Sequence, residues 1–138
     1  MTQQNSKLPL GIQDFEEMRR DCYIYADKTD MVWKLANGTK YNYLSRPRRF
    51  GKSLLCSTLK CYFEGRKELF EGLKIMDLEK DWKAYPVIRL DMSRGGANAE
   101  TLRSYLNLRF GYYEEKYAIT PDPTAQLADR FDAIITTA

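Results

Sequence analysis

Our expectation for the fold rests on the run Arg46-Pro47-Arg48-Arg49-Phe50-Gly51-Lys52-Ser53. It matches the phosphate-binding pattern G-x-x-x-x-G-K-[ST], except that Arg46 stands where the first glycine should be. The segment before it, residues 41–45, is short and rich in aromatic side chains, which is typical of a strand. From Lys52 onward, apolar residues recur at helical spacing. The order strand, loop, helix is the context that this motif needs, and it predicts a nucleoside triphosphate site.

The chemistry of such a loop depends on charge and backbone shape. Gly51 lets the backbone approach phosphate, Lys52 reaches the terminal phosphates, and the Ser53 hydroxyl holds Mg²⁺. Arg46 and Pro47 make the loop entry more open, and the arginines compensate by offering guanidinium donors. We therefore predict that Ser53 binds the metal and that the nucleotide is contacted by Arg46, Arg48, Arg49, Phe50, Gly51, Lys52, Ser53 and Leu54.

The charge distribution also indicates a local anion site. The 138 residues carry 22 basic and 19 acidic side chains, for a formal net charge of +3. Four basic side chains lie between Arg46 and Lys52, and removing those four from +3 leaves −1 for the rest of the chain. The composition, 43% hydrophobic and 30% charged, is typical of one globular domain. The positive excess therefore favours one anionic ligand over a surface for nucleic acid.

Residue types that are missing exclude several kinds of chemistry. The chain has no histidine, which excludes a Ser-His-Asp triad, a Cys-His dyad and a histidine-ligated zinc. Cys22, Cys56 and Cys61 are odd in number and have no metal-ligand spacing, so we expect reduced, mostly buried thiols in a cytoplasmic protein. No signal peptide and no apolar run of membrane-spanning length is present.

The rest of the chain alternates helix and strand patterns. Capping signals at Asp14 with Glu17, at Thr29 and at Thr124 accompany predicted helices at about 14–21, 30–36, 52–64, 99–117 and 124–135. Strands are predicted at 22–26, 41–45 and 86–92. Residues 66–85 form a connector whose apolar side chains pack down. This alternation predicts an α/β fold, a partial parallel sheet flanked by helices.

Several separated segments carry a family resemblance. Residues 43–59 (Tyr-Leu-Ser-Arg-Pro-Arg-Arg-Phe-Gly-Lys-Ser-Leu-Leu-Cys-Ser-Thr-Leu) resemble the bacterial AAA-ATPase-like domain family, and so, in order, do 8–15, 25–29, 62–65, 80–87 and 90–93. Arginine in place of the first glycine is that family's form of the Walker A loop. The resemblance implies a P-loop NTPase-like fold that binds ATP with Mg²⁺. It also implies that a nuclease-like domain of the PD-(D/E)XK type often lies further along such proteins.

The same resemblance places an acidic Walker B strand after a helix similar to residues 130–135, whereas the sequence ends at Ala138. We therefore expect residues 1–7 to be disordered and residues 8–138 to form the N-terminal portion of such a domain. The catalytic acid is unknown. Hydrolysis is expected only in a longer protein, with weak nucleotide binding and negligible turnover here. Unpaired edges of the strands at 41–45 and 87–91 would lead either to abnormal pairing of these two strands or to self-association.

Other residues have competing interpretations. Asp91 ends a predicted strand beside a Gly-rich loop, and it is either a ligand or a capping residue. Ile12 and Phe15 fit an adenine pocket, but we favour core packing for both. Asp27 is interpreted as a turn and cap residue, and the tyrosines from Tyr105 to Tyr117 as a packed helix face. Two rival functions remain open: a non-enzymatic module whose arginines bind nucleic acid or another polyanion, and a protein-interaction scaffold.

Overall fold

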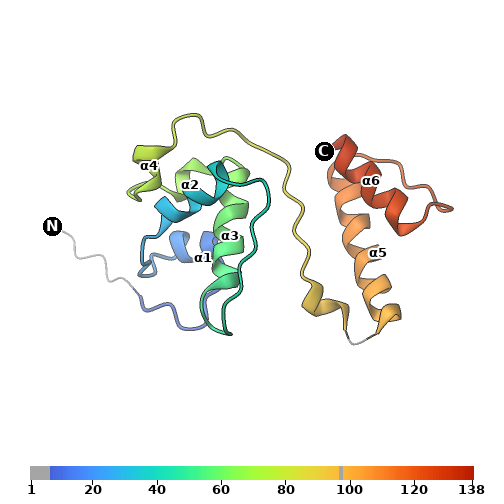
Figure 1. Ribbon diagram of the computed structural model, residues 1–138, viewed down its shortest axis with the longest axis horizontal. Coiled ribbons are helices and arrows are strands. Elements are labelled where there is room, and N and C mark those ends of the chain that lie inside the picture. Colours follow the sequence, from blue (N-terminus) through green and yellow to red (C-terminus); the bar gives the residue numbers. More distant parts are fainter. Residues whose placement is uncertain (1–6, 97) are drawn as a thin grey trace. The chain divides into compact units, whose positions relative to one another are not determined.

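A computed structural model describes residues 7–96 and 98–138 (Figure 1). The disorder expected for the N-terminus concerns residues that lie, apart from Lys7, outside this range. The chain divides into two compact units, one ending at Val87 and the other spanning Ile88–Ala138. Each unit has its own cluster of buried apolar side chains.

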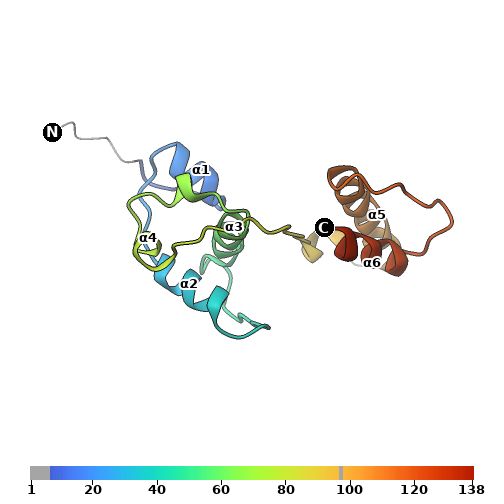
Figure 2. The same cartoon turned by 90° about the horizontal axis from the view of Figure 1, so that it is seen from above.

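The described part of the first unit, residues 7–87, contains four α-helices. They are α1 (Phe15–Arg20), α2 (Thr29–Asn37), α3 (Lys52–Phe63) and the short α4 (Ile75–Leu78), with a 3-10 turn η1 (Lys67–Leu69) before α4. Helix α3 contacts both α1 and α2, and α2 contacts α4 (Figures 1 and 2). Local signals set these boundaries: the Asp14 carboxylate accepts from the Glu17 amide at 3.0 Å as predicted, and α2 ends at Asn37 with Gly38 as its C-cap.

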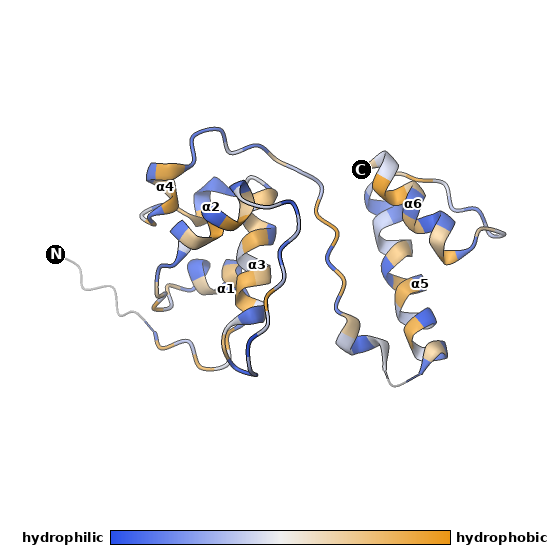
Figure 3. Ribbon diagram, in the orientation of Figure 1, coloured by the Kyte–Doolittle hydropathy of each residue, from blue (hydrophilic) through white to orange (hydrophobic). Residues whose placement is uncertain are grey.

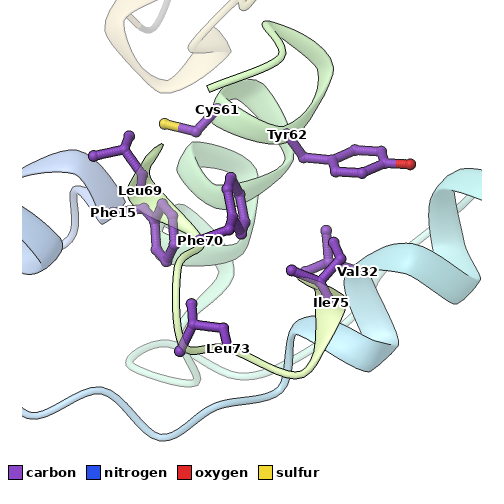
Figure 4. Close-up of a cluster of buried hydrophobic side chains, with 8 residues drawn as sticks. All are labelled: Phe15, Val32, Cys61, Tyr62, Leu69, Phe70, Leu73 and Ile75. Carbon is purple, nitrogen blue, oxygen red and sulfur yellow. The ribbon is translucent and has the colours of Figure 1, made fainter. Parts of the chain in front are cut away.

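Apolar side chains from every helix of the first unit meet in one core (Figure 4). Figure 3 shows hydrophobic residues on the helices of this unit and mostly hydrophilic residues along the loop between α2 and α3. The buried set includes most of the apolar residues that the sequence predicted to pack down in the connector. Its members are Phe15, Val32, Cys61, Tyr62, Leu69, Phe70, Leu73 and Ile75. A buried hydroxyl also joins two helices, because Ser57 in α3 donates to Asp14 and accepts from the Phe15 amide, each at 2.9 Å.

Asp27 and Thr29 connect the start of α2 to the start of α4 by hydrogen bonds. The Asp27 carboxylate accepts from the Thr29 hydroxyl at 2.6 Å and from the Lys74 amide at 2.8 Å, and Thr29 Oγ1 accepts from the Ile75 amide at 3.1 Å. Burial raises the pKa of Asp27, but these hydrogen bonds outweigh it and hold the pKa below its ordinary value. Thr29 is therefore a buried residue that connects α2 to α4 by hydrogen bonds. It is not the N-cap that the sequence predicted, because Lys28 occupies the N-cap position.

The second unit is a helical pair preceded by a 3-10 turn. Helices α5 (Ala99–Lys116) and α6 (Leu127–Thr137) pack on each other through Phe110, Tyr113 and Ile134, after the turn η2 (Met92–Gly95). Both long helices were predicted. The prediction that Thr124 caps the last helix was wrong. Gln126 and Asp129 form a capping box at the start of α6, whereas the Thr124 hydroxyl donates to Asp122.

The predicted α/β fold with a parallel sheet is wrong for the described residues. They contain no strand, only an isolated parallel bridge between Lys7 and Tyr23, and the segments 22–26, 41–45 and 86–92 are otherwise irregular or turn. A strand exists only through hydrogen bonds to a neighbour, which local composition does not supply. Residues 41–50 are all exposed. Near residues 89–91, tyrosine hydroxyls of α5 take the place of hydrogen bonds to a neighbouring strand. The Tyr113 hydroxyl accepts from the Arg89 amide and the Tyr105 hydroxyl accepts from the Asp91 amide, both at 2.7 Å.

Two further expectations concern membrane-spanning helices and the cysteines. Within the described residues, no helix combines the length and apolar character needed to cross a membrane. The three cysteines are free, as predicted, but only Cys61 is buried, while Cys22 and Cys56 are exposed. Burial raises the pKa of Cys61 to about 11, so this thiol is not a nucleophile.

Candidate functional site

The arginine-rich loop is an exposed segment that ends at the first turn of α3 (Figure 1). Two of its residues are left-handed, Arg49 with φ 66° and Gly51 with φ 75°. Gly51 is the N-cap of α3, and a Cβ built there would meet no atom within 4 Å. Glycine is therefore favoured by its backbone angle and not by crowding, and the space in front of the helix start is open.

Lys52 closes this loop on itself. Its ammonium group donates to the carbonyl oxygen of Arg46 at 2.5 Å, across six positions of the chain. The contact joins the lysine of the G-K-S element to the residue at the first-glycine position of the pattern. It holds the ammonium beside the loop, at the start of α3, and gives it a partner that an incoming anion can replace.

The start of α3 differs electrically from the other helix starts. The first turns of α1, α2, α5 and α6 all contain an acidic residue, whereas the first turn of α3 contains none and has no side-chain cap. Residues 31–63 include no Asp or Glu. The partial positive charge of the helix end and the four cations of the loop therefore add without an opposing carboxylate in this stretch. Such an arrangement favours an anion.

The predicted site residues lie together in the loop and the first turn of α3. All of them are exposed except Leu54, which is half-buried and packs against the core of the first unit. Leu54 can therefore offer its backbone amide but not its side chain. Phe50 is 67% exposed, so its ring is free to cover a ligand. The sequence identified this loop, but it did not predict the contact between Lys52 and Arg46.

Ser53 is the residue that the sequence predicts as a ligand of Mg²⁺. Among residues 7–96 and 98–138, no three His, Cys, Asp or Glu side chains gather as a metal site. Ser53 is exposed in the first turn of α3. Mg²⁺ prefers oxygen ligands and is commonly held by few protein groups together with phosphates and water. A single hydroxyl such as that of Ser53 fits this mode only together with phosphate oxygens and water.

The other candidate residues have structural roles. Asp91 belongs to the second unit and caps η2, because its carboxylate accepts from the Ser93 amide at 3.1 Å. The side-chain hydrogen bond from Ser93 lowers the pKa of Asp91. Phe15 is fully buried and its ring lies 4.8 Å from that of Phe70, as core packing requires, while Ile12 is half-buried. Tyr113 is buried in the second core, whereas Tyr112 is 51% exposed.

The described chain is thus a pair of small helical units with a cationic loop at the start of one helix. Residues 9–138 match the model of the AAA-ATPase-like family, described as predicted AAA-ATPase. The chain belongs to this family. It is also 45% identical over 91 residues to an uncharacterized protein in the vnfD 5′ region of Azotobacter chroococcum mcd 1, an alignment that covers 64% of this chain and 17% of that protein. No solved structure matches the chain significantly.

Proposed function

We propose that the loop from Arg46 to Ser53 binds the phosphates of a nucleoside triphosphate, ATP in keeping with the family description, together with Mg²⁺. The observation that carries the proposal is the uncapped start of α3, framed by four cations with no acidic residue in its first turn. An anion there gains both from the helix dipole and from charge-assisted hydrogen bonds.

Each residue has a distinct role in this proposal. Lys52 exchanges the Arg46 carbonyl for a terminal phosphate oxygen, and the arginines neutralise the remaining charge with bidentate donors. The amides of Ser53 and Leu54 point from the helix start to phosphate. Ser53 Oγ completes the Mg²⁺ shell alongside phosphate oxygens. These are binding roles, and we assign hydrolysis to no residue of this chain.

Hydrolysis is a proposal for a longer protein. The chain spans 17% of the relative named above. Hydrolysis of a nucleoside triphosphate needs a group that orients the attacking water, beyond the groups that hold the phosphates. No Asp or Glu lies in residues 31–63 to do this near the loop. We therefore propose that this chain binds nucleotide with little turnover and that the acid is supplied elsewhere.

The test compares two lysines of the same acid-free stretch. Mg-ATP should raise the thermal unfolding temperature of the wild type, because a ligand of the folded state stabilises it. Lys52→Ala should remove most of this rise, since Lys52 lies in the loop. Lys40→Ala should retain it, because Lys40 lies before the loop, with its ammonium over the Tyr41 ring. No rise in the wild type, or equal losses in both variants, would contradict the proposal.

A second candidate, binding of single-stranded nucleic acid, is favoured by one observation. Tyr41 and Tyr43, 83% and 93% exposed, precede the loop cations, and Phe50, 67% exposed, lies among them between Arg49 and Lys52. Exposed rings beside cations can stack bases while the cations contact the backbone. Salt-sensitive binding of an oligonucleotide that Mg-ATP does not displace would favour this function over nucleotide binding.

A further inference from the structure

A pocket of about 200 Å³ lies in the first unit at the other end of α3. It is smaller than the roughly 300 Å³ at which sites for drug-sized ligands begin, so it suits a group the size of a side-chain head. Gly65 has φ 69° and lies close to the segment that follows α4. A Cβ at Gly65 would lie 3.1 Å from the Trp82 carbonyl oxygen, so glycine allows this close approach. The lining residues are Ala36, Asn37, Tyr62, Phe63, Glu79, Asp81, Trp82, Lys83 and Tyr85.

Four aromatic rings form a continuous chain along this pocket. Trp82 and Tyr62 have ring centroids 5.8 Å apart at 68°, Tyr62 and Phe63 5.1 Å apart at 69°, and Phe63 and Tyr85 6.2 Å apart at 78°. Figure 4 shows the Tyr62 ring extending away from the other buried side chains of the core. Because successive rings are steeply inclined to each other, they present differently oriented faces and edges to the pocket. Aromatic faces attract cations.

The electrostatics of the pocket favour a positive ligand. Ala36 and Asn37 are the last residues of α2, and Tyr62 and Phe63 are the last residues of α3, so both helices direct their partly negative ends to it. Glu79 and Asp81 add two carboxylates, against the single cation of Lys83. The pocket therefore has the opposite charge preference from the arginine-rich loop.

Glu79 is fixed in place by the protein itself. One of its carboxylate oxygens accepts from the Tyr62 hydroxyl, and the other accepts from the amides of Lys80 and Asp81, each at 3.0 Å. The hydrogen bond from Tyr62 lowers the pKa of Glu79, which favours the charged form of this carboxylate. Asp81 and Lys83 are exposed, and they are free to respond to a ligand.

We propose that this pocket binds the head group of an organic cation, an alkylammonium or a guanidinium. The group comes either from a small free amine or from a Lys or Arg side chain of a peptide, since both present the same chemistry. The site is separate from the phosphate loop. Helix α3 runs from Lys52 to Phe63, which places its two ends about 16 Å apart at about 1.5 Å per residue.

The test uses NMR titration of the whole chain, observing the indole N–H of Trp82. The probes are agmatine, the blocked peptide acetyl-Gly-Arg-Gly-amide, and its neutral Gln counterpart. A saturable shift with both cationic probes assigns recognition to the head group, and one with the peptide alone assigns it to a peptide partner. Either result supports the proposal, provided that the Gln peptide gives none. No saturable shift with either cation, or an equal shift with the Gln peptide, overturns it.

Two pairs of variants test the charges. Asp81→Asn should weaken binding about two- to fivefold, as expected for a partly exposed ion pair. Lys83→Gln should tighten it, because Lys83 competes with the ligand. The controls are Asp77→Asn and Lys67→Gln, which change the same charges at exposed positions outside the pocket lining and should leave the affinity unchanged. Equal effects in pocket and control variants would mean that only net charge matters, and would overturn the site.

Discussion

At the scale of single residues, Gly51 is the position where backbone shape limits the sequence most directly. It caps α3 with φ 75°, an angle that costs other residues about 1–2 kcal/mol. The phosphate-loop pattern assigns this glycine to close approach of the backbone to phosphate, which stays a prediction; the structure shows a local constraint, one backbone angle at the start of the helix that follows.

We expect Gly51→Ala to lower the free energy of unfolding of the first unit by about 1 kcal/mol, measured by urea denaturation. The cost comes from the backbone alone, since the added methyl group meets open space. Gly111→Ala is a matched control with the opposite sign. Gly111 lies inside α5, and a Cβ there also meets nothing within 4 Å, so alanine should stabilise the second unit by about 0.5–1 kcal/mol. Two changes of the same sign would contradict this explanation.

The contact between Lys52 and Arg46 could not be predicted from single residues. The sequence predicted that Lys52 reaches a ligand, and the motif supports this because its residues are contiguous. It did not indicate that Arg46 offers its carbonyl oxygen to the ammonium group. That contact depends on the path of the loop, which includes a left-handed non-glycine residue, Arg49. Arg49 carries no local signal for this conformation.

At the scale of elements, helices were predictable and strands were not. Helix signals are local, and Asp14 and the Asn37-Gly38 pair mark the ends of α1 and α2 as expected. A strand depends on a distant partner. The segment near Arg89 has the apolar composition of a strand, but its backbone is bonded by hydroxyls of α5 instead of a neighbouring strand. The pocket was missed for the same reason, because its residues come from three separate segments.

The ion pair between α5 and α6 supports a prediction about pH. Arg130 donates to both oxygens of Glu114, at 2.7 Å each, and this hydrogen bonding holds the pKa of Glu114 below its usual value near 4.5. A lowered pKa means that the stabilisation is complete above about pH 4.5 and is lost as the pH falls through the folded-state pKa. At neutral pH, Glu114→Gln should lower the free energy of unfolding by about 3 kcal/mol, because it removes the carboxylate partner of the largely buried Arg130 and leaves Asn107 Oδ1 as a neutral acceptor.

The measurement is urea unfolding followed through amide signals of α5 at several pH values. The difference between wild type and Glu114→Gln should shrink below about pH 4.5. Glu115→Gln is the control, since Glu115 is the next residue and is exposed, so its loss should change the free energy by less than about 0.5 kcal/mol. A difference that stays constant down to low pH would show that packing, and not charge, connects the helices.

At the scale of the whole molecule, family membership and fold give different information. The family model covers residues from both units, whereas the parallel sheet expected from the resemblance is not found in the described residues. The self-association predicted from strand edges therefore has no such edges to use there. The alignment covers only 17% of the relative from Azotobacter chroococcum, so hydrolysis and a nuclease-like domain are proposals and not findings for this chain.

The two proposed sites of the first unit favour ligands of opposite charge. The start of α3 is framed by cations, and its end lies at a pocket with aromatic rings and two carboxylates. Because the ends are about 16 Å apart, variants at one end should leave binding at the other unchanged. This independence makes the two proposals separately testable.

The central claim is that the loop before α3 recognises phosphates. The most direct measurement is calorimetric titration of the chain with ATP, ADP, AMP and adenosine, each with Mg²⁺ at the same ionic strength. We expect the affinity to fall with each phosphate removed, adenosine to show no measurable binding, and Lys52→Ala to reduce the difference in affinity between ATP and AMP. Equal affinity for ATP and adenosine, or no binding of ATP, would contradict it.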